Sequence, residues 1–310
     1  MARKRRSPVS GSPVSGSPVS GSPVDSSGAG TPGSGDGYLL DNRQVEAGLR
    51  LTAISELFDP ATFRILGSTG VGPGWHCWEI GAGGPTVASW LAEQVGPTGS
   101  VLATDIDLSW MGDPVPGVTA QRHDVVADPL PPGPFDLIHA RLLLVHLPDR
   151  VEIGRSLVGL LRPGGWLVVE DADPALQPLA CIDEHGPDQQ LANRVRAGFR
   201  SLLSGRGVDL SFGRTLPRMF RGLGLVDVEA EAHFPVTSPA SEILERATVE
   251  QIRAGLLAAG QVTDEEVDRH LANLAAGHLD VATAPMVSTR GRRPPRTRPT
   301  EVAPGWRPVG

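Results

Sequence analysis

The chain has 310 residues, of which 40% are hydrophobic, and a formal net charge of −7. This length and composition fit one large globular domain with a substantial core. The sequence contains no apolar run near the roughly 18 residues of a membrane span and no secretory apolar segment, so we predict a soluble, cytoplasmic protein without a membrane partner.

The chain begins and ends in low-complexity sequence. Residues 7–24 repeat the unit Ser-Pro-Val-Ser-Gly, and the end from residue 290 is rich in Pro and Arg. Because such segments hold too few apolar side chains to offset ordering entropy, we predict disordered tails over 1–36 and 290–310 around a domain spanning 37–289. The tails hold 10 basic and 3 acidic residues of the 28 and 35 in the chain, which leaves the domain with 18 and 32, net −14. An acidic domain repels phosphates, so we expect no nucleic-acid partner.

Between the tails, strand and helix signals alternate. Predicted helices cover residues 39–58, 86–95, 150–161, 189–203, 216–223 and 241–276. Predicted strands cover residues 75–80, 100–104, 118–122, 135–140, 165–170, 225–234 and 280–289. A short helix is expected after the second strand, cut back by Pro114 and Pro116, and Thr263 with Glu266 forms a capping box inside the last helical stretch.

This alternation predicts an α/β fold of the Rossmann-like kind. We expect a doubly wound, mostly parallel, seven-stranded sheet with an N-terminal helix, and helical cap insertions at about 171–211 and 239–279. Sheets of this kind bind ligands at the carboxyl ends of their strands. Residues there are therefore the first candidates for a functional site.

Residue usage excludes several mechanisms. Lysine occurs only at Lys4 and tyrosine only at Tyr38. The domain therefore has no Schiff-base lysine, no phosphate-loop lysine and no Tyr/Lys dehydrogenase pair. Cys77 and Cys181 form no metal-spaced cluster, so they are interpreted as buried thiols in a reducing compartment, and no metal site is predicted.

The loop from Glu79 to Pro85, which contains three glycines, follows a predicted strand and opens a predicted helix. Such a loop lets a ligand approach the backbone closely. The dinucleotide pattern fails because Thr86 stands where a third glycine is needed, and no cation lies nearby for a pyrophosphate, which argues against a nicotinamide oxidoreductase. An acid at the mouth of the loop suits a cationic ligand, such as the ammonium and sulfonium of S-adenosylmethionine.

Two further acids close the next two strands. Asp105, 24 positions after Gly81, can accept both hydroxyls of a ribose. Asp124 can accept a hydrogen bond from an exocyclic amine such as that of adenine, with Val125 packed on the ring. The alternative is ordinary turn or helix capping by both acids, and a glycine loop that only packs helix against strand.

From the acid-Gly-x-Gly loop through FDLIHARLLLVHLPD to LRPGGWLVVED, the chain resembles the seven-strand methyltransferase superfamily, over roughly Tyr38 to Arg293. The resemblance implies S-adenosyl-L-methionine as cofactor, bound by Glu79, Gly81, Ala82, Gly83, Asp105, Ile106, Asp124, Val125 and Arg141. The loop residues would contact the methionine portion, which Arg141 borders. The sequence departs at Pro85, where many relatives have Gly, but a missing N–H at a helix start costs no helical bond.

Methyl transfer from a sulfonium is an in-line displacement that requires alignment and exclusion of water. If the acceptor is a hydroxyl, a general base helps, and His146 is the first candidate, with a loop-orienting role as its alternative. His139 is expected to be buried structure, and Asp171, Asp173 and His185 are weaker candidates.

We expect a small organic acceptor, methylated on oxygen or nitrogen, because the domain is acidic and its inserts can enclose a compact ligand. The Arg, Ala, Gly and Pro bias indicates a GC-rich bacterial genome, with specialised-metabolite tailoring as one setting. Two alternatives stay open: a protein that binds S-adenosylmethionine without transferring methyl groups, and an RNA methyltransferase that uses its basic tails. The sequence does not predict the oligomeric state.

Overall fold

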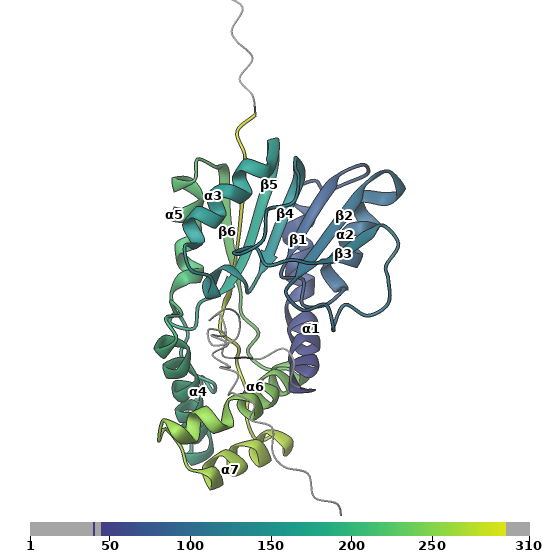
Figure 1. Cartoon of the computed structure of the whole chain (residues 1–310). Coiled ribbons are helices and arrows are strands. Elements are labelled where there is room, and N and C mark those ends of the chain that lie inside the picture. The colour runs from purple at the N-terminus through teal and green to yellow at the C-terminus, as the bar shows by residue number, and fades with distance from the viewer. Residues whose placement is uncertain (1–39, 41–44, 296–310) are drawn as a thin grey trace, which may run out of the picture. The chain divides into compact units, whose positions relative to one another are not determined.

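The computed structural model describes residue 40 and residues 45–295, and these form an α/β fold around a seven-stranded sheet (Figure 1). The strands are β1 His76–Ile80, β2 Ser100–Asp105, β3 Val118–Arg122, β4 Phe135–Arg141, β5 Leu161–Ala172, β6 Val226–His233 and β7 Met286–Arg292. Their order is β3-β2-β1-β4-β5-β7-β6. β7 runs antiparallel to both of its neighbours, and the pairs among β1 to β5 are parallel. The predicted fold class is confirmed.

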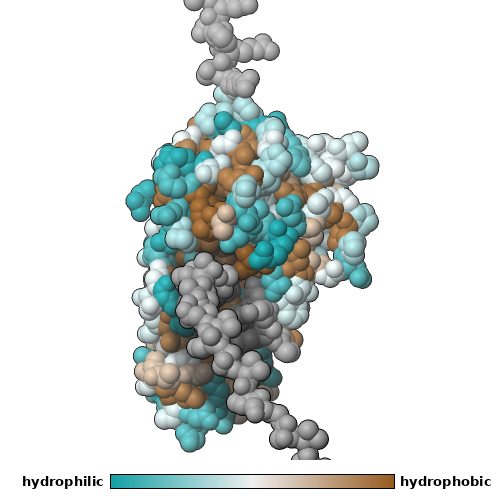
Figure 2. Space-filling view, in the orientation of Figure 1, coloured by the Kyte–Doolittle hydropathy of each residue, from teal (hydrophilic) through white to brown (hydrophobic). Residues whose placement is uncertain are grey.

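Helices cover both faces of the sheet and extend beyond one end of it (Figure 1). They are α1 Val45–Gly67, α2 Thr86–Val95, α3 Arg150–Leu160, α4 Pro187–Gly205, α5 Phe212–Gly222, α6 Pro239–Ala258 and α7 Asp264–Ala275, with short 3-10 turns η1 Gly96–Thr98 and η2 Leu144–His146. Among the described helices, none is long and apolar enough to cross a bilayer. In the space-filling view, hydrophilic residues cover much of the visible surface and are interrupted by hydrophobic ones (Figure 2).

Side-chain alternation along the strands explains two separate cores. Even-numbered residues of β1 and β4, such as Trp78 and Ile138, join a cluster completed by α3 and α5. Odd-numbered residues, such as Cys77 and Leu137, join a cluster completed by α1 and α2. Because successive strand residues point to opposite faces, a buried strand reads as a continuous apolar run, as Trp75 to Ile80 nearly does.

Three predicted boundaries were wrong. α1 continues to Gly67, although Pro60 lacks a helical N–H, because Ala61, Ile65 and Leu66 on the far side of the proline are buried. The chain between β2 and β3 forms turns instead of the short helix that was expected. The C-terminal tail does not begin at residue 290, because β7 pairs with β5 as far as Arg292. The predicted tail over 1–36 lies outside the described residues.

Helices α4, α6 and α7 gather beyond one end of the sheet (Figure 1). They bury their own apolar cluster, to which Val195, Ile252 and Val267 contribute. α7 starts at the predicted capping box: the Thr263 hydroxyl accepts from the Glu266 N–H, and the Glu266 carboxylate accepts from the Thr263 N–H. We call α4, α6 and α7 the helical lobe.

Candidate functional site

Strand register brings four charged residues together on the α1 side of the sheet. Glu79 in β1 lies directly opposite His139 in β4, and Arg141 in β4 lies opposite Glu170 in β5. The two β4 residues are separated by one position, so they share a face. β7 then places Ser288 opposite Glu170. A spacing of two along one strand, with matching register on its neighbours, therefore builds a polar row across the middle of the sheet.

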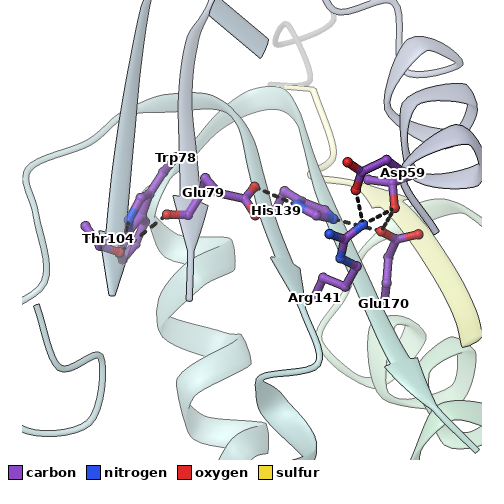
Figure 3. Close-up of polar contacts among 8 residues, drawn as sticks. Asp59, Trp78, Glu79, Thr104, His139, Arg141 and Glu170 are labelled. Carbon is purple, nitrogen blue, oxygen red and sulfur yellow. Dashed lines mark hydrogen bonds and ion pairs between the residues drawn. The ribbon is translucent and has the colours of Figure 1, made fainter. Parts of the chain in front are cut away.

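The row is connected by hydrogen bonds and closed by α1 (Figure 3). His139 Nδ1 lies 2.6 Å from Glu79 Oε2, and His139 Nε2 lies 3.1 Å from Glu170 Oε2. Glu170 also accepts from the hydroxyls of Ser288 and Thr62, the latter at 2.6 Å. Arg141 donates to Thr62 and, at 2.8 Å, to a carboxylate oxygen of Asp59. Two residues of α1 thus meet the polar row.

These contacts decide the protonation of the buried groups. Burial alone would lower the pKa of His139, but the charge of Glu79 and hydrogen bonds to both glutamates raise it to about 9. Burial would raise the pKa of Glu170, but the hydrogen bond and charge of His139 lower it to about 2. His139 is therefore a cation at neutral pH that donates to a glutamate side chain on each side.

Glu79 is 2% exposed, and its carboxylate lies inside the sheet, bonded to His139. The sequence analysis expected this carboxylate at the mouth of the glycine loop. The structure places it elsewhere because Glu79 is an interior residue of β1 whose partner across the sheet is an imidazole. His139, by contrast, is fully buried, as the sequence indicated.

The glycine loop is held by backbone bonds at the carboxyl ends of β1 and β2. The N–H groups of Gly81 and Ala82 both donate to the carbonyl of Thr104, at 2.7 and 3.0 Å. Gly81 and Gly83 adopt φ of +67° and +62°, a region that other residues rarely enter. The Thr104 hydroxyl, one strand away, also accepts from Trp78 Nε1 at 2.9 Å (Figure 3). The loop is therefore fixed by hydrogen bonds between its backbone and the backbone of β2.

Asp105, which is 8% exposed, accepts from the Gly83 N–H at 2.9 Å and from the Asp107 N–H at 3.0 Å. Burial raises its pKa, and these backbone hydrogen bonds oppose that rise. Two parts of the predicted site are thus in contact, because the Asp105 carboxylate at the end of β2 accepts a hydrogen bond from the glycine loop after β1. Ile106, directly after Asp105, is 56% exposed.

After the end of β3, two consecutive valines differ in exposure. Val125 is partly buried and packs against the core, whereas Val126 is 50% exposed. Asp124 accepts from the N–H groups of Val126 and Ala127, at 2.9 and 3.3 Å, so it caps the turn after β3. The adjacent strand ends of β2 and β3 therefore each present one exposed aliphatic side chain, Ile106 and Val126.

A second compartment lies between the sheet and the helical lobe. It is a cavity of about 170 Å³, lined by residues of α1, α4 and α6 and by the segments after β4 and β5. Most of its wall is apolar, with Phe58, Phe199 and Leu203 among its members. A small organic molecule is the kind of ligand that such a cavity accepts.

His146, in the turn η2, lines this cavity. Burial, together with the nearby charge of Arg50, lowers the pKa of His146 to about 4. The imidazole is therefore neutral at physiological pH. The residue that the sequence selected as a candidate base does lie at the cavity, in a form that can accept a hydrogen bond.

The cavity and the glycine loop share a wall. Leu142, at φ +53°, turns the chain out of β4 and lines the cavity, while a Cβ on Gly81 would meet the next residue, Leu143, at 3.2 Å. On α1, Arg50 lines the cavity, while a Cβ on Gly83 would meet Leu51 at 3.1 Å. Two pairs of consecutive residues thus separate the compartments.

The three weaker candidates are engaged in other surroundings and do not line the cavity. Asp171 is fully buried, with a pKa that burial raises well above its ordinary value, near the backbone of Leu144 and Val145. Burial would raise the pKa of Asp173, but hydrogen bonds from Arg214 outweigh it and lower that pKa. His185 is exposed and borders Asp183. None of the three is among the residues that line the described cavity.

Sequence reasoning missed Arg50, Arg200, Leu142 and Val126. Arg50 and Arg200 sit in ordinary amphipathic helices, and nothing in their spacing marks them. The sequence does carry a signal for the contact among Glu79, His139 and Glu170, because each is an ionisable residue inside an apolar strand. A buried charge in a strand needs a partner, and the neighbouring strands are where it must come from.

Comparison with known proteins agrees with this arrangement. Residues 78–169, from β1 into β5, match the family model described as a methyltransferase domain. The chain is 34% identical over 143 residues to methyltransferase str3 of Strobilurus tenacellus, an alignment that covers 44% of this chain and spans about half (48%) of that relative. It is 28% identical over 272 residues to nocamycin O-methyltransferase of Saccharothrix syringae, which covers 77% of this chain and 93% of that protein.

Among solved structures, a complex of the Haemonchus contortus phosphoethanolamine N-methyltransferase 2 with phosphomonomethylethanolamine and S-adenosylhomocysteine is similar, at 17% identity and a TM-score of 0.49, covering 83% of this chain and 60% of that one. The strand order, with its antiparallel β7, and the glycine loop at the end of β1 define a Rossmann-like domain of the methyltransferase kind. Through residues 78–169 the chain carries a domain of the class I S-adenosylmethionine-dependent methyltransferase type, and S-adenosylmethionine is the cofactor of that domain family.

Proposed function

We propose that the protein transfers a methyl group from S-adenosylmethionine to a small organic acceptor held in the cavity beneath the helical lobe. The observation that carries the proposal is the shared wall: residues 142–143 and 50–51 face the cavity with one side chain and the glycine loop with the next. Transfer in line requires donor and acceptor to meet with water excluded. Two adjoining compartments satisfy that requirement.

The donor would be held along the carboxyl ends of β1 to β4. The loop residues Gly81, Ala82 and Gly83 offer backbone without side-chain obstruction, and Asp105 offers carboxylate oxygens for ribose hydroxyls. For the adenine ring, we assign the exposed Ile106 and Val126 as flanking side chains, in place of the half-buried Val125.

The remaining residues of the predicted donor site are Asp124, Arg141 and Glu79, and each is assigned a role from its position in the structure. Asp124, which already caps its turn, lies where an exocyclic amine could reach it, and Arg141 borders the methionine end from the Asp59 side. Glu79 would act from inside the buried row and not by direct contact, because its carboxylate is hydrogen-bonded to His139. An acidic side chain close to the loop favours a ligand with an ammonium and a sulfonium.

S-adenosylmethionine supplies an electrophilic methyl group when it is bound. The protein's part is to orient the acceptor and exclude water, and the apolar cavity wall does both. A neutral His146 can accept a hydrogen bond from an acceptor hydroxyl, which orients the oxygen. Because its pKa is lowered to about 4, His146 is a weak proton acceptor at neutral pH, so we assign it orientation first and proton removal second.

The relative named nocamycin O-methyltransferase, aligned along 93% of its length, supports a small-molecule acceptor and transfer to oxygen. The same comparison supports a setting in specialised metabolism. The competing possibility, binding of S-adenosylmethionine without transfer, makes the same prediction for the donor site but none for the cavity.

Calorimetry with S-adenosylmethionine tests the donor site. We expect the wild type to bind and Asp105→Ala to lose at least about 10-fold in affinity, or ~1.4 kcal/mol. Asp113→Asn, an exposed acid in the same connection between β2 and β3, is the matched control and should bind like the wild type. Equal affinity of wild type and Asp105→Ala would contradict the site.

Glu79→Gln sharpens the assignment, since it removes a buried charge and keeps the shape of the side chain. We expect a loss of affinity smaller than that of Asp105→Ala, because the effect acts through the field and not through a direct contact. A larger loss than that of Asp105→Ala would show that Glu79 turns toward the ligand.

A further inference from the structure

The cavity is lined by more cationic than anionic side chains, in a chain whose net charge is −7. Three arginines line it, Arg50, Arg196 and Arg200, against two acids, Asp209 and Glu245. The excess of positive charge is therefore local to the cavity, whereas the overall composition of the chain gives an excess of negative charge. Which of these charges faces a ligand depends on how the five groups pair.

Arg196 and Glu245 neutralise each other. Arg196 Nη2 donates to Glu245 Oε2 at 2.6 Å, and both side chains are buried, at 10% and 6% exposure. Burial would raise the pKa of Glu245, but the charge of Arg196 and the hydrogen bond from His270 lower it to about 2. Arg196 also donates to the carbonyl of Ala282. This pair supports the lobe and leaves no net charge for a ligand.

Asp209 is also engaged, and its side chain is partly exposed. One of its carboxylate oxygens accepts from the N–H and the hydroxyl of Ser211, at 3.0 and 2.9 Å. The other lies 4.0 Å from Arg150 Nη2, and the side chain is 39% exposed. Its charge is thus shared with Arg150 and solvent, outside the apolar part of the wall.

Arg200 is different. It lies one helical turn beyond Arg196 on α4, which places both on the same side of the helix. Its Nε is buried and has no hydrogen-bond acceptor, and no described residue forms an ion pair with it. A buried guanidinium N–H without an acceptor costs free energy that a ligand oxygen would recover. Arginine in this state binds carboxylates and similar oxyanions well.

The rest of the cavity matches the body of such a ligand. Phe58, Phe199 and Leu203 are apolar wall residues, and Leu142 extends the apolar surface toward the glycine loop. Arg50, close enough to His146 to affect its protonation, adds positive potential on the α1 side. A cationic amine would meet these arginines at a cost, and a neutral apolar molecule would leave Arg200 Nε without an acceptor.

We propose that the acceptor is an apolar molecule that carries an anionic oxygen group, and that Arg200 holds that group. This inference rests on the proposed function, because it names the acceptor class for the same cavity.

The test uses two probes of equal shape, naphthalene-2-carboxylate and naphthalene-2-carboxamide, titrated into the full chain by calorimetry at pH 7.5. We expect the carboxylate to bind the wild type at least about 10-fold more tightly than the carboxamide. Arg200→Gln should bring the ratio close to one, while Arg200→Lys should keep part of it because the charge remains. Arg206→Gln, an exposed arginine at the end of the same helix, is the matched control and should keep the full ratio.

Leu244→Trp, on the α6 wall, locates the probes: filling the cavity should weaken both. Equal affinities in the wild type, binding of neither probe, or an unchanged ratio in Arg200→Gln would each overturn the inference. If Arg200→Gln does not fold, the wild-type ratio still tests the acceptor class, and Arg200→Lys still tests the residue. If the ratio is absent while S-adenosylmethionine still binds, this inference fails alone. If the ratio is present without S-adenosylmethionine binding, the proposed function fails and the anionic site stands.

Discussion

The glycine loop together with Asp105, which we call the rim, and the cavity under the helical lobe are built in different ways. At the rim, backbone groups hold backbone groups: N–H groups after β1 donate to the Thr104 carbonyl, and Asp105 closes the loop from one strand away. At the cavity, side chains from α1, α4 and α6 and from two inter-strand segments converge, and no backbone motif joins them. The first region is specified by a few consecutive residues, and the second by packing across the chain.

This difference fits the proposed division of labour between one donor and an acceptor that can vary. A backbone-built rim tolerates few changes, because glycines at positive φ cannot be replaced freely. A side-chain-built cavity can change its ligand with single substitutions. The following predictions ask whether the two regions respond separately, as this view requires.

The largest effect is expected at the polar row below the rim. His139→Leu removes the imidazolium between the buried carboxylates of Glu79 and Glu170, which should cost about 3–5 kcal/mol of unfolding free energy. Urea denaturation measures it. His185→Leu, at an exposed histidine, is the control and should change stability by less than about 0.5 kcal/mol. A small effect at His139 would mean that the row is not a cooperative part of the sheet.

The pH dependence of this difference has a defined sign. The folded-state pKa of His139, about 9, lies above its ordinary 6.5, so its stabilisation is complete below pH 6.5 and is lost as pH rises through 9. The folded-state pKa of Glu170, about 2, lies below its ordinary 4.5, so its stabilisation is complete above pH 4.5 and is lost as pH falls through 2. The stability difference between wild type and His139→Leu should therefore be largest between pH 4.5 and 6.5. A difference that grows toward pH 9 would contradict the ion-pair account.

An intermediate effect is expected in the glycine loop. Gly81→Ala places a Cβ at positive φ and 3.2 Å from Leu143, which should cost about 1–2 kcal/mol and weaken S-adenosylmethionine binding. Gly84→Ala is a matched control three positions on, since its nearest contact would be 3.9 Å away, at the Trp110 carbonyl, and its φ is not positive. Thermal unfolding and calorimetry on both variants provide the comparison. Equal losses would show that loop sequence matters apart from its backbone conformation.

The smallest effect is expected in the helical lobe. Thr263→Ala removes the cap of α7 and should cost about 0.5–1 kcal/mol, with faster hydrogen exchange in the first turn of that helix. Binding of S-adenosylmethionine should stay at the wild-type value, because α7 contributes no residue to the rim. A change in donor affinity here would show that lobe and rim are coupled through more than their shared wall.

The sequence predicted most of what depends on local pattern. Strand and helix alternation gave the sheet, and the capping box of Thr263 and Glu266 formed as expected. The contact between Asp105 and the glycine loop follows from their places at the ends of neighbouring parallel strands. These features need only a few residues on either side to be recognised.

The sequence did not predict features that depend on packing between distant segments. α1 runs past Pro60 because residues beyond it are buried against the sheet, a gain that no local rule contains. The Glu79 carboxylate turns into the sheet because β4 happens to place His139 beside it. Arg200 becomes a candidate ligand contact only because α4 packs over the cavity. In each case, the deciding partner lies tens of residues away.

Leu142 and Leu143 are consecutive, yet they serve opposite compartments. A leucine at φ +53° is held there against a cost of about 1 kcal/mol, so the position of this peptide is set by its surroundings and not by its own preference. A ligand that moves this peptide from the cavity side also moves it on the side of the glycine loop. Thermodynamic reciprocity then requires that an occupant of the cavity change the affinity for the nucleoside by the same factor as the nucleoside changes the affinity for that occupant. In such an arrangement, the affinities of the two ligands are coupled through a single bend of the chain.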